Sequence, residues 1–249
     1  MKSRINKKEL RDSVCDKAKK MFFTQSTLEK NLCSASIAEL QLVSNLFDDE
    51  LETRRINRRA RYQKQAGFPV PKSFTTYDFN GINFPHKLPQ EKMLSLEFIR
   101  NKEVILFYGS CGSGKTHAMT ALGIKACNSD YKVKFYTVSQ LIMKLKTARK
   151  EGMLEKLYKT LDKQDLICLD EFGYVPMDLE GGQLLFQVIS AAYERQSLIL
   201  TTNLPFNAWG PIFSDEQLAA AVIDRIVHHG HMVKTGNKDW RLEHSLMAN

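Results

Sequence analysis

The sequence lacks the features of a membrane-embedded or disulfide-built protein. No apolar run approaches the roughly 18 residues that a membrane-spanning helix needs, and the polar start contains no hydrophobic segment of a secretory signal. The cysteines are odd in number and form no Cys-x-x-Cys pair, which favours reduced thiols over a disulfide or zinc framework; they are Cys15, Cys33, Cys111, Cys127 and Cys168. We therefore expect a cytoplasmic protein with no membrane partner.

Glycine and proline are absent before Gly67, which predicts a helical region at the start of the chain. Apolar residues at three- and four-residue spacing indicate helices at about 7–23, 36–47 and 48–65. The segment Gly67–Pro71 then breaks the helix. We predict a small all-α domain at residues 1–66, a linker at 67–88 and a larger domain at 89–249.

Positive charge is concentrated in the helical region. The chain carries 36 basic and 28 acidic residues, a net charge of +8, and residues 1–70 hold 15 basic against 9 acidic residues, or +6 of that charge. The densest patch contains no acid: Arg54, Arg55, Arg58, Arg59, Arg61 and Lys64. Such a patch is typical either of a solvated helix surface or of a contact with nucleic-acid phosphates, and the absence of balancing acids favours the second interpretation.

The larger predicted domain contains a phosphate-binding loop. Residues 109–116 read Gly-Ser-Cys-Gly-Ser-Gly-Lys-Thr, directly after an apolar strand and before an amphipathic helix. The glycines let backbone N–H groups point at phosphate oxygens, and the helix start adds its dipole. Lys115 is expected to contact the β- and γ-phosphates and Thr116 to hold Mg²⁺. The loop predicts a nucleoside triphosphate as ligand, bound by Gly109, Ser110, Cys111, Gly112, Ser113, Gly114, Lys115, Thr116 and His117. The aromatic residues of the linker, Phe74, Tyr77, Phe79 and Phe84, suit either wrapping of the nucleotide base or ordinary packing.

Strands and helices alternate after this loop, which indicates a parallel sheet. Apolar strands are expected at 104–108, 133–137, 166–169, 197–201 and 231–234. The third strand runs into Asp170 and Glu171, at the sheet edge where ligands bind in open α/β folds. We predict that Asp170 holds Mg²⁺ and Glu171 polarises the attacking water, the alternative being a solvated strand end.

The remaining candidate residues depend on these two motifs. Asn203 ends the next strand and is expected either to orient the attacking water or to open a turn. Arg225, on the last helix, suits either an arginine finger for a neighbouring subunit or a salt bridge with Asp224 or another acid. His228 and His229 predict no metal site, because adjacent helical residues face different ways and no clustered carboxylate is recognisable.

Several sequence strings together resemble a known family. They are GSCGSGKTH at 109–117, DEFGYVPMD at 170–178, YERQSLILTTNLPF at 193–206 and LAAAVIDRIVHH at 218–229, with ELETRRINRRARYQKQAGFP at 50–69 before them. The chain resembles the IstB family, AAA+ helper ATPases of insertion-sequence transposons, and is more distantly similar to the DnaC and DnaI helicase loaders.

The resemblance implies an α/β P-loop AAA+ (ASCE) fold, with a five-stranded parallel sheet flanked by helices, a small all-α N-terminal domain and no separate C-terminal lid. It implies a Mg²⁺-dependent ATPase with Lys115 and Thr116 in Walker A, Asp170 and Glu171 in Walker B, Asn203 as sensor 1 and Arg225 as arginine finger. It also implies a head-to-tail homo-oligomer that binds ATP between subunits, grips duplex DNA and recruits and stimulates a transposase. Where relatives commonly end in Ser-Tyr-Arg, this chain has Asp239-Trp240-Arg241, so the role of that arginine is not carried over.

Other functions stay open from the sequence. A DnaC-like helicase loader shares the ATPase core but prefers single-stranded DNA. A P-loop kinase needs an acceptor pocket and an Arg-rich lid, and neither is clear in the sequence. A DNA-binding assembly protein without hydrolysis is disfavoured by the intact set of Lys115, Asp170 and Glu171.

Overall fold

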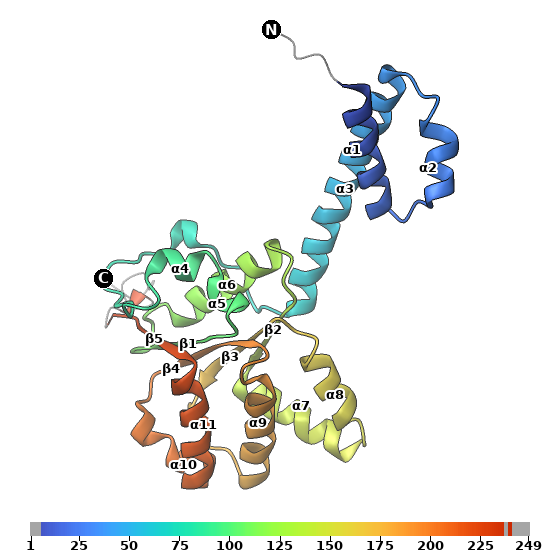
Figure 1. Ribbon diagram of the computed structural model, residues 1–249. Helices are drawn as coiled ribbons and strands as arrows, with labels where there is room; N and C mark the ends of the chain where they lie inside the picture. Colours follow the sequence, from blue (N-terminus) through green and yellow to red (C-terminus); the bar gives the residue numbers. More distant parts are fainter. Residues whose placement is uncertain (1–5, 237–238, 241–249) are drawn as a thin grey trace. The chain divides into compact units, whose positions relative to one another are not determined.

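The structure, a computed structural model, describes residues 6–236 and 239–240 and divides into two compact units, residues 1–61 and 62–249. The first unit contains α1 (Lys7–Lys20), α2 (Gln25–Leu32) and most of α3 (Ile37–Ala66) (Figure 1). Its small core consists of Val14, Ala18, Leu28, Leu32 and Leu40. Asn6 caps α1 by accepting a hydrogen bond from the backbone of Lys8, at 3.0 Å.

Helix α3 is continuous where the sequence suggested two helices that meet at Phe47 and Asp48. No glycine or proline interrupts this stretch, and Asp48 serves as a mid-helix partner, because Lys17 Nζ lies 2.6 Å from its Oδ2. Helix α2 was not predicted. Its eight residues are mostly polar, and the Thr24 side chain accepts no capping hydrogen bond from a backbone N–H at its start, so the local sequence pattern is weak.

The second unit is built on a five-stranded sheet in the order β2-β3-β4-β1-β5. All strand pairs are parallel, and the strands are β1 (Val104–Tyr108), β2 (Val133–Thr137), β3 (Leu166–Phe172), β4 (Ser197–Thr202) and β5 (Gly230–Lys234). The predicted parallel five-stranded sheet with flanking helices is confirmed. Because every strand runs the same way, the C-terminal ends of β1, β3 and β4 meet at one edge, and the phosphate loop follows β1 there.

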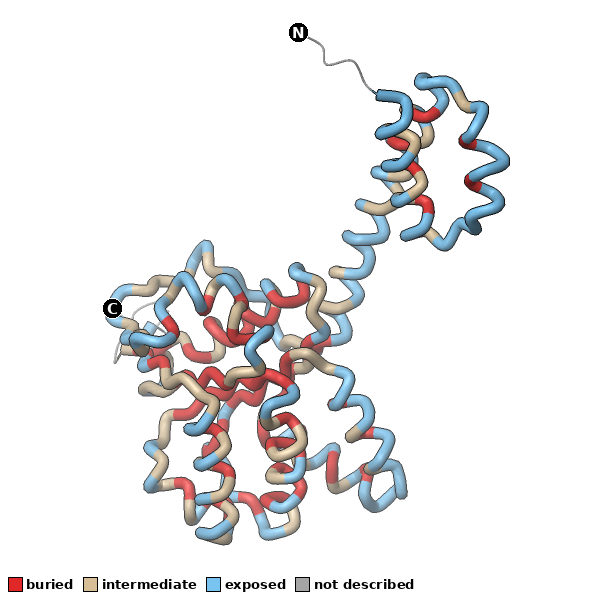
Figure 2. Tube along the Cα trace, in the orientation of Figure 1, coloured by how far each residue is buried: buried red, intermediate tan, exposed pale blue. Residues whose placement is uncertain are grey.

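Helices cover both faces of this sheet (Figure 1). On one face, α4 (Gln90–Leu94), α5 (Glu97–Arg100) and α6 (Lys115–Asn128) share a core with Ile105 and Phe107. On the other face, α7 (Val138–Lys150), α8 (Leu154–Leu161), α9 (Leu179–Ala192), α10 (Gly210–Phe213) and α11 (Glu216–His228) share a core with Leu106 and Leu198. Alternate residues of β1 thus enter opposite cores, so the strand is apolar throughout. The strands β1, β3 and β4 are almost wholly buried, whereas the edge strand β5 is mostly half-buried (Figure 2).

Strand β3 extends three residues beyond its predicted end at Leu169, and a bulge interrupts its pairing with β4 between Leu169 and Phe172. Phe172 returns to the core, where it is fully buried and stacks on Trp209 with ring centroids 4.4 Å apart. The apolar side chain after the two acids therefore anchors the strand end. Among the described helices, none combines the length and apolar character needed to cross a bilayer.

We predict that Phe172→Ala lowers the free energy of unfolding by about 3–5 kcal/mol, since the stacked ring leaves a cavity. Chemical denaturation measures this change. Val175→Ala, at an exposed position three residues later, is the matched control and should change stability by about 0.5 kcal/mol or less. Equal costs for the two variants would contradict the anchoring role of Phe172.

Candidate nucleotide-binding site

The loop between β1 and α6 adopts backbone angles that favour glycine. Gly112 and Gly114 have φ values of 72° and 85°, in the left-handed region that side chains with a Cβ disfavour. Gly109 is required for a different reason: a Cβ there would lie 2.2 Å from Thr235 Oγ1. The loop is thus packed against the end of β5 as well as wrapped for a phosphate.

Lys115, the first residue of α6, is nearly buried, with 6% of its surface exposed. Its Nζ donates to the carbonyl oxygens of Gly109 at 2.9 Å and Ser110 at 2.6 Å. The ammonium is therefore held at the rim of the loop by oxygen acceptors, which phosphate oxygens can replace with a stronger charge-assisted contact.

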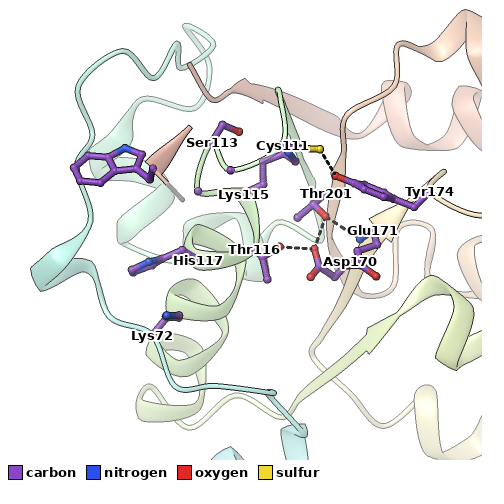
Figure 3. A pocket seen from close by; sticks show the side chains of 13 residues that line it. Lys72, Cys111, Ser113, Lys115, Thr116, His117, Asp170, Glu171, Tyr174 and Thr201 are labelled. Atoms are coloured by element: carbon purple, nitrogen blue, oxygen red, sulfur yellow. Dashed lines mark hydrogen bonds between the residues drawn. The ribbon is translucent and has the colours of Figure 1, made fainter. Parts of the chain in front are cut away.

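Asp170 lies where α6, β3 and β4 meet (Figure 3). Its Oδ1 accepts hydrogen bonds from Thr116 Oγ1 at 3.0 Å and from Thr201 Oγ1 at 2.5 Å. A carboxylate beside two hydroxyl groups is a set of hard oxygen ligands, so Thr116 and Asp170 fit Mg²⁺ chemically. The sequence analysis did not predict Thr201 as a site residue. Its position two residues before Asn203 was the single signal for it.

Glu171 adopts a positive φ of 60° at the bulge of β3. Its backbone N–H donates to Thr201 Oγ1 at 3.0 Å, and its side chain is exposed beside the buried Asp170. The two adjacent carboxylates thus have different surroundings, one enclosed by hydroxyl groups and one open to water. Such an arrangement allows one acid to hold a cation while the other contacts a water molecule.

Tyr174 and Asn203 approach the loop from the ends of β3 and β4. The Tyr174 hydroxyl lies 3.5 Å from Cys111 Sγ, and burial together with this thiol raises the pKa of Tyr174 to about 12. Asn203 Nδ2 lies 4.0 Å from the same sulfur, and its buried Oδ1 has no hydrogen-bond partner among the described residues. Asn203 is therefore at the loop with an acceptor available. Tyr174 was not predicted as a site residue, although it lies in the DEFGYVPMD string.

One cavity of about 400 Å³ is lined by Lys72, Cys111, Gly112, Ser113, Gly114, Lys115, Thr116, His117, Asp170, Glu171, Tyr174, Thr201 and Trp240 (Figure 3). Asn203 is not among these lining residues and reaches the site only through its approach to Cys111. A smaller hollow of about 130 Å³ adjoins this cavity, bounded by Tyr77, Asp78, Asn80, Gly114 and His117 among others. His117 is fixed between them, since its Nε2 lies 2.8 Å from the Ser73 carbonyl oxygen and its ring 5.0 Å from that of Tyr77.

Comparison with known proteins identifies the family. The profile of the IstB-like ATP binding proteins matches residues 17–248. The chain belongs to this family. It is 34% identical over 204 residues to an insertion sequence IS232 ATP-binding protein of Bacillus thuringiensis subsp. berliner, covering 82% of each chain. It is 36% identical over 188 residues to an insertion sequence IS21 ATP-binding protein of Pseudomonas aeruginosa, covering 74% of this chain and 70% of that one. The crystal structure of the DnaC helicase loader shares the fold, with a TM-score of 0.52, 18% identity and coverage of 70% of this chain and 98% of that one.

In this IstB-like chain, Asp239 and Trp240 lie against the phosphate loop. The Trp240 N–H donates to the Gly112 carbonyl oxygen at 3.3 Å. A Cβ built on Gly112 would lie 1.8 Å from Asp239 Oδ1, so an acidic side chain packs directly on the loop. Arg241 lies outside the described residues. The Asp239 carboxylate brings negative charge to the loop that is shaped for phosphates.

Arg225 is not brought together with the cavity residues. Its Nη1 donates to the Ala221 carbonyl oxygen at 2.8 Å, and its guanidinium lies 4.8 Å from the centroid of the Phe186 ring. Among the described residues, no salt bridge joins the Arg225 guanidinium to the Asp224 carboxylate, so that alternative is not seen. A role toward a neighbouring subunit stays a prediction.

The predicted basic patch lies on α3. Two of its members pair with acids on the preceding turn: Arg54 Nε lies 2.6 Å from Glu50 Oε1, and Arg55 Nη2 lies 2.8 Å from Glu52 Oε2. The other members, Arg58, Arg59, Arg61 and Lys64, follow on the same helix. Glu50 and Glu52 thus balance part of the positive charge of the patch. The sequence interpretation treated the patch as lacking balancing acids.

The geometric reason for dismissing His228 and His229 was wrong. Helix α11 ends at His228, and His229 is its C-cap residue with φ −113° and ψ 23°, so the pair is not within a regular helix. The two ring centroids lie 4.8 Å apart, and the Glu194 carboxylate joins them from the turn before β4. A clustered carboxylate is therefore present, from a residue distant in sequence.

We predict that Asp239→Asn binds ATP more tightly, because the substitution removes a negative charge from the phosphate loop at nearly constant size. One charge contact of this kind in water is worth about 1 kcal/mol, or roughly fivefold in Kd. Calorimetric titration with ATP measures the change, and Asp162→Asn, at an exposed position beyond α8, controls for net charge. Unchanged or weaker ATP binding by Asp239→Asn would show that this carboxylate does not oppose the nucleotide.

Proposed function

We propose that this IstB-like protein is a Mg²⁺-dependent ATPase that binds target duplex DNA and recruits and stimulates a transposase. The observation that carries the ATPase proposal is the meeting of Lys115, Thr116, Asp170 and Glu171 in one cavity. Several relatives are named as ATP-binding proteins of insertion sequences, which supports the link to transposition.

Each site residue has a proposed role. Lys115 binds the β- and γ-phosphates, and Thr116 and Asp170 hold Mg²⁺, which when bound neutralises charge that develops on the transferred phosphoryl group. Glu171 accepts a proton from the attacking water, while Asn203 orients that water through its side-chain amide. The exposed position of Glu171 and the available acceptor of Asn203 support these roles. Arg225 is proposed to act on the nucleotide of a neighbouring copy in a head-to-tail assembly.

The segment 67–88 is proposed to hold the nucleotide base. Tyr77 packs on the loop, since a Cβ on Gly114 would lie 3.0 Å from its ring. The Tyr77 hydroxyl is buried without a hydrogen-bond partner among the described residues, and it borders the hollow together with Asp78 and Asn80. A polar base edge would supply that partner, which supports this segment as the base side of the site.

The helical residues 1–66 are proposed to serve assembly and DNA contact. The basic patch of α3 supports a phosphate-backbone contact, which is independent of base sequence. The alternative function is a helicase loader, which the shared fold with DnaC favours. ATP turnover measured without DNA, with single strands and with duplex separates the two. Stimulation chiefly by duplex supports the transposition helper, and stimulation chiefly by single strands supports the loader.

Glu171→Gln should bind ATP normally and hydrolyse it about 10²–10⁴ times more slowly, because the amide cannot accept the proton of water. Single-turnover hydrolysis and nucleotide titration on the same preparation measure the two properties. Glu180→Gln is the matched control and should turn over normally, because Glu180 is a half-buried helix residue outside the cavity whose carboxylate pairs with Arg149 at 3.3 Å. Normal turnover by Glu171→Gln would assign activation of the water to another group.

Reversal of Arg54, Arg55, Arg58 and Arg59 to Glu should weaken duplex binding and flatten its dependence on salt concentration, since fewer counterions are released. Binding isotherms over a range of salt concentrations give the slope. The control reverses four exposed lysines of α1, namely Lys7, Lys8, Lys19 and Lys20, with the same change of net charge. If both variants keep the wild-type slope, α3 is a solvated surface; if both flatten it equally, DNA binding depends on net charge alone.

A further inference from the structure

Two imidazoles and one carboxylate meet at the end of the sheet opposite the phosphate loop. His228 and His229 precede β5, and Glu194 precedes β4, so all three lie where strands begin. Each side chain offers one ligand atom, and these atoms lie within 4.8 Å of one another. None of the three lines the nucleotide cavity. The cluster is therefore separate from the nucleotide cavity, although Glu194 and His229 share a small hollow with Arg225.

The backbone holds these residues in fixed places. Glu194 has a positive φ of 57° in the tight turn after α9. The His229 carbonyl oxygen accepts from the Val104 N–H at 2.8 Å, which ties the histidine pair to the start of β1. Gly230 allows the close turn into β5, since a Cβ there would lie 2.0 Å from the Ile226 carbonyl oxygen. Ligand groups on such turns need little ordering when they bind an ion.

The side chains already point toward one another. His229 Nε2 lies 2.9 Å from Glu194 Oε1, and the Tyr193 hydroxyl lies 2.6 Å from His228 Nδ1. The contact between His229 and Glu194 joins two of the three candidate ligands, and an ion between them would replace it. Tyr193 lies outside the ligand set, and a hydrogen bond from such a neighbour orients an imidazole ring. Two imidazole nitrogens and one carboxylate oxygen suit Zn²⁺, whose ligand atoms lie about 2.0–2.2 Å from the ion. The cluster reaches that geometry if exposed side chains move inward by roughly 1 Å, and its exposure leaves a fourth position for water.

We propose that Glu194, His228 and His229 bind a divalent transition-metal ion, with Zn²⁺ as the best match to this donor set. The ion joins the turn between α9 and β4 to the turn between α11 and β5. The cluster offers one carboxylate and two imidazoles, whereas the proposed Mg²⁺ site at Thr116 and Asp170 offers oxygen ligands. The two proposed cation sites therefore differ in ligand type. This site does not depend on ATP binding or hydrolysis.

The test is a titration of the full-length, tag-free chain with Zn²⁺ after removal of metals by a chelator. Wild-type protein should bind one equivalent of Zn²⁺. The variants His229→Ala and Glu194→Gln should each fail to bind this equivalent or bind it at least tenfold more weakly. His231→Ala is the matched control: it removes a second His–Glu pair, with Nε2 3.4 Å from Glu103 Oε2, and should keep that equivalent. Co²⁺ should give visible absorption bands typical of low coordination in wild type and in His231→Ala only.

The proposal is overturned if the wild-type chain does not bind one equivalent of Zn²⁺, or if His229→Ala and Glu194→Gln bind Zn²⁺ as tightly as wild type does. Thermal denaturation separates binding from misfolding. Zn²⁺ should raise the Tm of wild type and leave that of Glu194→Gln unchanged, because only a folded, intact site gains stability from the ion. Glu194 is exposed, so its metal-free variant should keep the wild-type Tm and carry the test even if His229→Ala folds poorly.

Discussion

The buried Asp170 carboxylate is the constraint on which the site's arrangement depends. A carboxylate with 4% of its surface exposed needs hydrogen-bond donors, and one of its oxygens accepts from both Thr116 and Thr201. These contacts join the first turn of α6 to the ends of β3 and β4. The phosphate loop is thereby fixed relative to the sheet edge, since Thr116 directly follows Lys115. The same contacts set the direction of the chain after Asp170.

The bulge of β3 gives two neighbouring acids different surroundings. With Asp170 turned inward to the threonines, Glu171 adopts a positive φ and turns outward, and Phe172 returns to the core against Trp209. Thr201 stabilises both positions, because its hydroxyl donates to Asp170 and accepts from the Glu171 N–H. A strained residue held in this way is common at functional sites. The division of work that we propose, cation at Asp170 and water at Glu171, follows from this geometry.

Local sequence patterns predicted the fold and the loop, whereas contacts between distant segments were beyond them. The apolar strands and the glycine-rich string are read over a few residues, so the parallel sheet was predictable and is confirmed. Thr201 and Tyr174 reach the site through long-range pairing and a loop, and no spacing rule marks them. The same reason explains the error at His228 and His229, whose carboxylate neighbour Glu194 lies 34 and 35 residues upstream of them. Helix α3 continues through Asp48, where the sequence suggested a break, and no glycine or proline ends it there.

The most direct test of the proposed cation site is the Mg²⁺ dependence of ATP binding by Asp170→Asn. The substitution keeps a side-chain oxygen for the Thr116 and Thr201 hydroxyls but removes the charge that would hold the cation. Wild-type protein should bind ATP more tightly with Mg²⁺ than with a chelator present, and Asp170→Asn should bind ATP equally in both conditions. An undiminished Mg²⁺ enhancement in Asp170→Asn would contradict the account, because the cation would then be held elsewhere.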